Sequence, residues 1–260
     1  MRPSDYKLLQ HAFSHQPDEE VDLHQTSSDR STNPGHLSSE LIYFMLGHKE
    51  LFNLFSQTMD KHIVVEAGAG PGYFSMMSSL ILKRGRQRRV IAMEKDQRRS
   101  DRLLRWVDML VNEHGYSRQS LPVVRFGDFT KNDVPEFEWG LRNRRLSIYL
   151  NNYNDALSGL GGPQEKLADK LGQCKVGSVV IALGPFFHRD LNWREERYIT
   201  TVPNDGMSWT RNRTGARKDL RIFKYTKVMN DRANVGKHRR RCANVRKLRY
   251  SFHGKNLGIA

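Results

Sequence analysis

Residues 63–73 read I-V-V-E-A-G-A-G-P-G-Y, and this stretch decides the fold. A short apolar run ends at the acid Glu66, and the glycines Gly68, Gly70 and Gly72 follow at alternate positions. Glycine keeps the backbone free of side chains, so a ligand can approach it closely. The pattern is typical of a buried parallel strand that ends against a nucleotide-like ligand, but a glycine-rich turn alone is a weak signal.

Three further apolar runs end in residues that can contact a ligand. They are R-V-I-A-M before Glu94, P-V-V-R-F-G before Asp128 and Phe129, and L-S-I-Y-L before Asn151, Asn152 and Tyr153. In an open α/β sheet, ligands bind outside the carboxyl ends of the strands, so we expect these residues and the glycine loop to line one crevice. Together they predict a pocket for S-adenosyl-L-methionine.

The spacing of the loop argues against two other ligands. Its form, E-x-G-x-G-x-G, differs from the G-x-G-x-x-G of NAD-binding proteins, and no G-K-[ST] follows as in a P-loop. Within the predicted pocket, we expect the Glu94 carboxylate to accept both ribose hydroxyls. Asp128 would accept from the adenine amine, and Phe129 would sandwich the base. The alternatives are a solvated acid at Glu94 and a simple turn at 128–129.

The other strand ends also leave two interpretations open. Glu66 either holds the amino end of the cofactor through the loop or caps the following helix. Asn151 orients the cofactor or the incoming amine and Tyr153 walls a channel, or the asparagines only form an Asx-rich turn.

The alternation of strand-like and helix-like segments predicts an α/β fold: a doubly wound, mainly parallel Rossmann-like sheet with helices on both faces and antiparallel strands at its C-terminal end. Expected strands start at residue 63 and span 89–93, 121–126, 146–150 and 176–183, with antiparallel strands within 194–229. Expected helices span 38–59, 73–83, 97–113 and 163–171. We expect residues 1–33 to be largely disordered, 34–229 to form the catalytic domain, and 230–260 to be a basic tail.

Charge is concentrated at the end of the chain. The formal net charge is +15, and residues 211–260 contain sixteen Lys and Arg against two Asp, so the rest is nearly neutral. Such a block indicates an arm that faces nucleic acid, or a nuclear-import signal. Its contacts with phosphates would come from Lys237, Arg239, Arg240, Arg241, Arg246, Lys247 and Arg249.

The remaining composition favours a monomeric intracellular protein. Cys174 and Cys242 are too few for a disulfide framework, and no apolar run approaches the roughly 18 residues of a membrane span. The amino terminus shows no secretory hydrophobic region. We expect no metal site, because His188, His238 and Cys242 lack the spacing of metal ligands.

Several segments together resemble one protein family. They are G-H-L-S-S-E-L-I (35–42), E-A-G-A-G-P-G (66–72), M-E-K (93–95), G-D-F (127–129), Y-L-N-N-Y (149–153), G-P-F (184–186) and M-S-W-T (207–210). In order and approximate spacing this series resembles the catalytic domain of the Dot-one (disruptor of telomeric silencing) histone lysine methyltransferases, a non-SET class. The resemblance covers residues 35–228. Its N-N-[FY] and S-W-T pieces are fairly specific, whereas the whole superfamily shares the glycine loop.

The resemblance implies a Rossmann-like S-adenosylmethionine-dependent enzyme that methylates a lysine of nucleosomal histone three in the nucleus, with a basic segment on DNA. It implies that Asn151 lies beside the transferred methyl group and that Tyr153 and Trp209 wall a lysine channel. The other matching positions, Glu66, Gly68, Gly70, Gly72, Glu94, Asp128 and Phe129, would contact the cofactor.

The chain departs from the family at four places. His36 and Leu37 replace an acid and a threonine, Glu66 replaces an aspartate, and N-N-Y-N-D replaces N-N-F-A-F. Because of an insertion at 211–218, the family's channel tyrosine has no clear counterpart, and Phe223 and Tyr225 are candidates for it. The cofactor site is therefore better supported than lysine specificity.

Two rival functions remain open. A nucleic-acid methyltransferase would use Asn151 and Tyr153 as adenine amino methylases use an N-P-P-[YF] loop, which here lacks its prolines but suits the basic tail. A non-catalytic nucleic-acid-binding module on the same fold would bind no cofactor.

Overall fold

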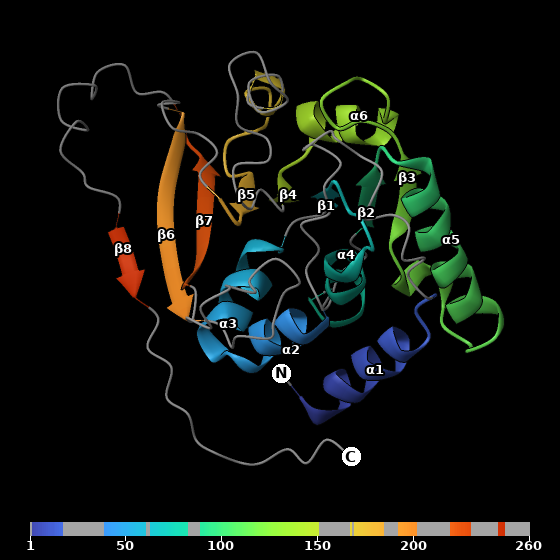
Figure 1. The fold of residues 1–260 in the computed structure, drawn as a ribbon. Coiled ribbons are helices and arrows are strands. Elements are labelled where there is room, and N and C mark those ends of the chain that lie inside the picture. Colours follow the sequence, from blue (N-terminus) through green and yellow to red (C-terminus); the bar gives the residue numbers. More distant parts are fainter. Residues whose placement is uncertain are drawn as a thin grey trace, which may run out of the picture.

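The computed structural model describes residues 2–17, 39–60, 63–82, 89–150, 167, 169–184, 192–201, 219–229 and 244–247. Its centre is an eight-stranded sheet with the order β3-β2-β1-β4-β5-β7-β6-β8 (Figure 1). The strands are β1 (Ile63–Ala67), β2 (Arg89–Glu94), β3 (Val123–Phe126), β4 (Leu146–Leu150), β5 (Val179–Ala182), β6 (Trp193–Thr201), β7 (Asp219–Lys227) and β8 (Asn244–Lys247).

Strands β1 to β5 run parallel, and β7 lies antiparallel between β5 and β6. The predicted doubly wound Rossmann-like sheet with an antiparallel C-terminal part is confirmed. Every side chain of β1, β4 and β5 is buried, as expected for parallel strands that are covered on both faces.

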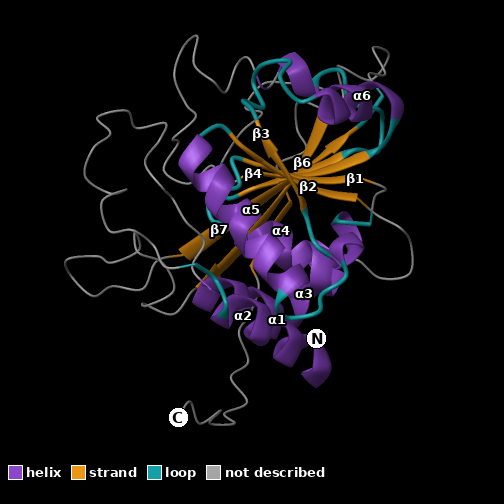
Figure 2. Ribbon diagram, turned by 90° about the vertical axis from the view of Figure 1, so that its right-hand side faces the viewer, coloured by secondary structure: helices purple, strands orange, loops and turns teal. Residues whose placement is uncertain are grey.

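Helices cover both faces of the sheet, as the sequence predicts (Figure 2). Five of them contribute to one core cluster: α1 (Pro3–Ser14), α2 (Ser39–Gly47), α3 (Lys49–Thr58), α4 (Tyr73–Met77) and α5 (Gln97–Asn112). The opposite face packs on α6 (Pro135–Asn143) and on Leu167 and Leu171. Alternate residues of β1 divide between the clusters, because successive side chains of a strand point to opposite faces.

The strand order reverses at β1, which lies between β2 and β4. The register pairs Ala67 with Met93 on β2 and with Leu150 on β4, while Glu94 pairs with Phe126 on β3. The carboxyl ends of four strands therefore meet at one edge of the sheet, next to the switch point where ligands of such folds bind.

The expectation that residues 1–33 are disordered is wrong for 3–14, which form α1 along α5. Pro3 occupies the first turn, where its missing N–H costs nothing, and Leu9, Ala12 and Phe13 are buried in the first cluster. Trp106 of α5 donates its Nε1–H to the carbonyl of Ala12 at 3.0 Å. Apolar residues at i, i+3 and i+4 were the sequence signal for this amphipathic helix.

The expected helix 38–59 is two helices instead. His48 separates them, and its ring Nδ1 accepts the Leu51 N–H at the start of α3. After the glycine loop, α4 continues as one π-helical turn, Ser78–Leu82, and helix α6 was not predicted. The expected strands at 121–126 and 176–183 are shorter, at 123–126 and 179–182.

The basic tail is not wholly separate from the domain. Its residues 244–247 form β8, which extends the sheet in parallel to β6 and includes the backbones of Arg246 and Lys247. The other tail residues expected to contact nucleic acid, Lys237, Arg239, Arg240, Arg241 and Arg249, lie outside the described residues. Among the helices that the structure describes, none is long and apolar enough to cross a membrane.

The docking of α1 can be tested with two adjacent leucines. Leu9 is fully buried whereas Leu8 is 38% exposed. We expect Leu9→Ala to lower the free energy of unfolding by about 2–5 kcal/mol, because it removes buried methyl groups and leaves a cavity. Leu8→Ala is the matched control and should change it by less than about 0.5 kcal/mol. Equal effects of the two variants in urea denaturation would contradict the docked helix.

Candidate functional site

The glycine loop is tied to the end of β2 by a buried hydrogen bond. The Gly70 N–H donates to Glu94 Oε2 at 2.7 Å, and the Asp96 N–H donates to Oε1 at 2.9 Å. The Glu94 residue is only 4% exposed. A carboxylate accepts about four hydrogen bonds, so each Glu94 oxygen keeps one lone-pair direction for a further donor.

The loop has a backbone that only glycine adopts easily. Gly68, Gly70 and Gly72 have φ values of 73°, 53° and 75°. The Gly68 and Ala69 N–H groups both donate to the carbonyl of Met93, which fixes the loop against β2. At Gly72, a Cβ would lie 2.5 Å from Leu103 Cδ1, so α4 and α5 pack closely only because this residue is glycine.

Glu66 caps the helix after the loop, which was one of its two predicted roles. Its Oε2 accepts the Ser75 N–H at 2.8 Å and the Ser75 hydroxyl, so it fills a donor of the first turn of α4. Burial raises the pKa of Glu66 to about 8; the Ser75 hydrogen bonds oppose this rise, and the nearby Glu94 adds to it. At neutral pH the Glu66 side chain is therefore mostly a neutral acid.

Asp128 and Phe129 follow β3 at the same edge, and the Gly127 N–H donates to the Glu94 carbonyl at 2.9 Å. Asp128 Oδ1 accepts the N–H and hydroxyl of Thr130, at 2.9 and 2.7 Å, which forms the predicted alternative, a turn. Burial would raise the pKa of Asp128, but these hydrogen bonds, with the charges of Lys95 and Lys131, lower it, so the group is a carboxylate.

Phe129 is packed in the protein core. It is 8% exposed within the second core cluster, and its Cε1 lies 3.4 Å from the place of a Cβ on Gly68. The ring therefore packs against the glycine loop at Gly68. Its role as an adenine contact stays a prediction.

The other predicted site residues fall in parts of the chain that the structure leaves undescribed. Asn151, Asn152 and Tyr153 follow the last residue of β4, Leu150, and lie outside the described residues, as does Trp209. Their roles stay predictions.

The two candidates for the channel tyrosine lie on β7. Phe223 and Tyr225 are buried in the second core cluster, with ring planes 8° apart and centroids 6.3 Å apart. Both side chains thus contribute to the packing of the sheet.

Sequence reasoning missed two residues beside the loop. Ser75 is the partner of Glu66, and its position in the first turn after Gly72 was the available signal. Tyr149 is fully buried and stacks on Phe74, with centroids 3.7 Å apart, and its hydroxyl has no hydrogen-bond partner among the described residues. Burial raises the pKa of Tyr149, and the charge of Glu66 adds to this rise.

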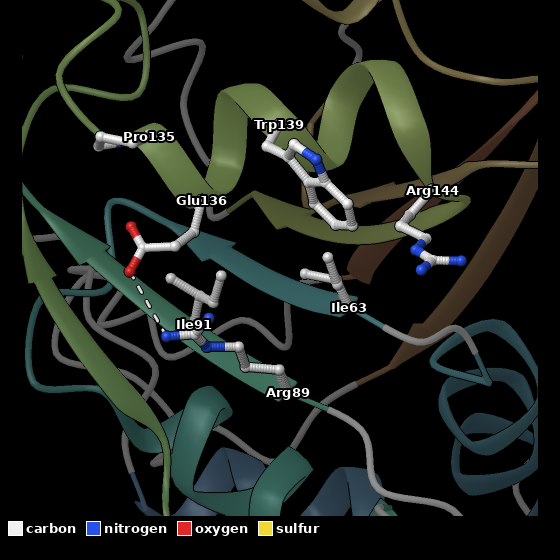
Figure 3. Close-up of a pocket in the computed structure, with 7 residues that line it drawn as sticks. All are labelled: Ile63, Arg89, Ile91, Pro135, Glu136, Trp139 and Arg144. Atoms are coloured by element: carbon white, nitrogen blue, oxygen red, sulfur yellow. Dashed lines mark hydrogen bonds and ion pairs between the residues drawn. The ribbon is translucent and has the colours of Figure 1, made fainter.

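A hollow of about 570 Å³ lies at the opposite edge of the sheet (Figure 3). Ile63 and Arg89, the first residues of β1 and β2, line it together with Trp139 of α6. Because the strands are parallel, this hollow is separated from the glycine loop by the length of the strands. It is not the predicted cofactor crevice.

The described edge suits one class of ligand better than another. A pyrophosphate at a helix N-terminus needs free backbone N–H groups. Here the Gly70 N–H is bonded to Glu94 and the Ser75 N–H to Glu66, and Asp128 adds a further negative charge. The site therefore favours a ligand with hydroxyl or amine donors, or a positive charge, over one with phosphates.

No protein-family model matches the chain, and no curated protein matches it. Among solved structures, it is similar to a Pyrococcus horikoshii protein provisionally named an RNA methyltransferase, with 18% identity over 89% of this chain and all of the other, at a TM-score of 0.45. An O-methyltransferase from Bacillus cereus in complex with SAH matches with 12% identity, 87% and 92% coverage and a TM-score of 0.45. Precorrin-6y C5,15-methyltransferase from Geobacter metallireducens matches with 13% identity over 68% of this chain and 87% of the other, at a TM-score of 0.43. At such values these similarities support no statement about activity or substrate.

The raised pKa of Glu66 predicts a pH-dependent stability. The pKa of Glu66 is about 4.5 in the unfolded chain and about 8 in the folded protein. The stabilisation of the folded state by the protonated Glu66 is therefore fully present below pH 4.5 and is lost as the pH rises through 8. We expect the wild type to lose roughly 2–4 kcal/mol more than Glu66→Gln between pH 5 and pH 8, at up to about 1.4 kcal/mol per unit. Gln keeps an acceptor for Ser75.

Denaturation of both proteins at the two pH values measures this difference. The exposed Glu50→Gln is the control and should follow the wild type. Parallel pH curves for the wild type and Glu66→Gln would mean that Glu66 is ionised in the folded protein.

Proposed function

We propose that the chain is an S-adenosylmethionine-dependent methyltransferase whose cofactor lies at the carboxyl edge of β1 to β4. The observation that carries this proposal is the 2.7 Å hydrogen bond between the Gly70 N–H and Glu94. It brings the glycine loop and the end of β2 together, and it occupies an N–H that a phosphate would need. A phosphate-free, cationic nucleoside fits this arrangement.

Each described residue of the edge has a role in this proposal. The open lone pairs of Glu94 would accept the two ribose hydroxyls, and the Asp128 carboxylate would accept the adenine amine. Gly68 and Gly70 would let the cofactor lie against the loop backbone. Both carboxylates also favour a ligand that carries a positive charge.

When bound, S-adenosylmethionine supplies an activated methyl group on a sulfonium centre. The chain then has to align the acceptor with this group and exclude water, and such positioning contributes roughly 7–11 kcal/mol in favourable cases. Asn151 is proposed to lie beside the transferred methyl group, with Tyr153 and Trp209 as walls of the acceptor channel. An apolar channel next to a positive charge lowers the pKa of a lysine amine, so the amine arrives neutral and needs no general base.

For the substrate we propose a lysine of a nucleosomal histone, with the basic C-terminal tail on DNA. Support comes from the series of segments shared with the Dot-one family, above all N-N-Y at 151–153 and S-W-T at 208–210. Sixteen Lys and Arg in the last fifty residues suit a partner that carries nucleic acid, and they would act in the nucleus.

A second candidate is a methyltransferase that acts on RNA or DNA itself. The same basic tail favours it, because the tail would hold a nucleic-acid substrate as well as a nucleosome. In that case Tyr153 would stack on an extruded base.

The cofactor proposal is tested first by calorimetric titration with S-adenosylmethionine. We expect Gly70→Arg to abolish binding, because the new side chain would occupy the place proposed for the cofactor at the loop backbone. Glu94→Gln should weaken binding roughly 10- to 100-fold, because a charged hydrogen-bond acceptor is lost. Gly115→Arg is the control: Gly115 also has a positive φ, of 68°, and nothing lies within 4 Å of its Cβ position.

Both substituted glycines have a positive φ, 53° at Gly70 and 68° at Gly115. We expect circular dichroism to show that both variants are folded, and only Gly70→Arg to fail to bind. Unchanged binding by Gly70→Arg would refute the pocket. No binding by the wild type at high micromolar cofactor would favour the non-catalytic binding module.

The substrate is identified by measuring the transfer of tritiated methyl groups to nucleosomes, free histones, RNA and DNA in parallel assays. We expect the label on a histone lysine of nucleosomes, at a rate that falls at least about tenfold in Asn151→Ala, because the acceptor loses its alignment. Label on RNA or DNA alone would select the second candidate. Gln substitution of Lys237, Arg239, Arg240 and Arg241 should weaken activity on either polyanionic substrate and leave cofactor affinity unchanged.

A further inference from the structure

Three histidines that are not part of the proposed cofactor site meet where the end of α1 lies next to the end of α5. His11 lies in the last turn of α1 and His15 is the C-cap residue of the same helix, four positions further along the chain, so their side chains lie on the same side of the helix end. His114 comes from the turn after α5. The ring centroid of His15 lies 3.7 Å from that of His114 and 4.6 Å from that of His11. One ligand atom from each residue lies within 4.8 Å of the other two.

Hydrogen bonds orient two of the rings for metal binding. His15 Nδ1 lies 2.8 Å from the carbonyl oxygen of His11. A carbonyl only accepts, so Nδ1 carries the proton and Nε2 keeps a free lone pair. Such a bond to a backbone carbonyl is the usual way in which a protein fixes the tautomer of a histidine ligand.

His11 is oriented in the same sense through Tyr116. The Tyr116 hydroxyl donates its one proton to the Leu8 carbonyl at 3.2 Å. The 3.0 Å contact between Tyr116 Oη and His11 Nδ1 then requires the proton on Nδ1, which leaves Nε2 of His11 as the ligand atom. Two Nε2 atoms are thus available next to the ring of His114.

The frame around the three rings is built from the core. Leu9, Ala12 and Phe13 bury one face of α1, and Trp106 of α5 holds the Ala12 carbonyl. The histidines lie at the solvent side of this contact, where His11 is exposed and His15 and His114 are half-buried. An ion can therefore reach them without unfolding the helix pair.

The geometry points to a Zn²⁺ site formed by His11, His15 and His114, which clasps α1 to the end of α5. Imidazole nitrogens suit zinc, and three protein ligands with a water in the fourth position form a common tetrahedral set. Ligand atoms at about 2.0–2.1 Å from zinc in a tetrahedron are ~3.3 Å apart. The three histidine atoms lie within 4.8 Å of one another, so small rotations of the side chains would bring them to this spacing. The site is separate from the cofactor crevice and does not depend on the proposed activity.

The test uses the full chain without an affinity tag, treated with a chelator and titrated with Zn²⁺ in a calorimeter. We expect saturation at one ion per chain. Single substitutions His11→Ala, His15→Ala and His114→Ala should each weaken binding more than about tenfold, because loss even of an outer-shell partner costs about 10–100-fold. His48→Asn is the control, since His48 caps α3 and is not part of the cluster, and Asn keeps an acceptor at the cap; this variant should bind as the wild type does.

A structural clasp also predicts a change that enzyme assays would not report. Zn²⁺ should raise the melting temperature of the wild type and of His48→Asn, and should not raise that of His114→Ala. His114→Cys should restore binding, because a thiolate is a zinc ligand. Binding that is not saturable, or that the three substitutions leave unchanged, would overturn the site.

Should an alanine variant fail to fold, the visible spectrum of the Co²⁺-loaded wild type gives the answer. Intense bands of a tetrahedral ion with nitrogen ligands are expected. The weak spectrum of a hydrated octahedral ion would overturn the proposal.

Discussion

The carboxyl edge of β1 to β4 depends on two buried carboxyl groups that accept hydrogen bonds from backbone N–H groups. Glu94 binds the loop at Gly70, and Glu66 binds the first turn of α4 at Ser75. A buried amide without a partner costs about 1–3 kcal/mol, so these contacts fix where the loop lies relative to β2 and α4. The same contacts disfavour a phosphate ligand, since they occupy backbone donors that a phosphate would otherwise bind. Structure and selectivity therefore arise from one arrangement.

Much of the sheet could be predicted because β1 to β4 are short, mainly apolar runs, each followed by a polar residue or a glycine. The sequence around β1, β2 and β4 satisfies local propensity and burial together, and these strands appear where expected. The convergence of Gly70, Glu94 and Asp128 followed from the rule that parallel strands share their carboxyl edge. That rule says nothing about hydrogen bonds, so it left open whether Glu66 caps a helix or faces a ligand.

The errors have physical causes that local composition does not show: a tertiary contact at the amino terminus and a helix cap at residue 48. The first residues are rich in polar side chains, and only Leu9, Ala12 and Phe13, buried against α5, make them a stable helix. His48 interrupts an apolar run that is long enough for one helix, because its ring serves as a cap. The three histidines at 11, 15 and 114 come together only through this helix contact, so spacing along the chain could not reveal them all.

The position of α1 also determines how the protein can be shortened. The segments that resemble a known enzyme family begin at residue 35, which suggests a natural starting point for a minimal catalytic fragment. A fragment that began there would expose Trp106 and the apolar side chains that α1 buries, and such an exposed apolar surface promotes self-association. Poor solubility of such a fragment would reflect the loss of α1 from the core and not a defect in the rest of the fold.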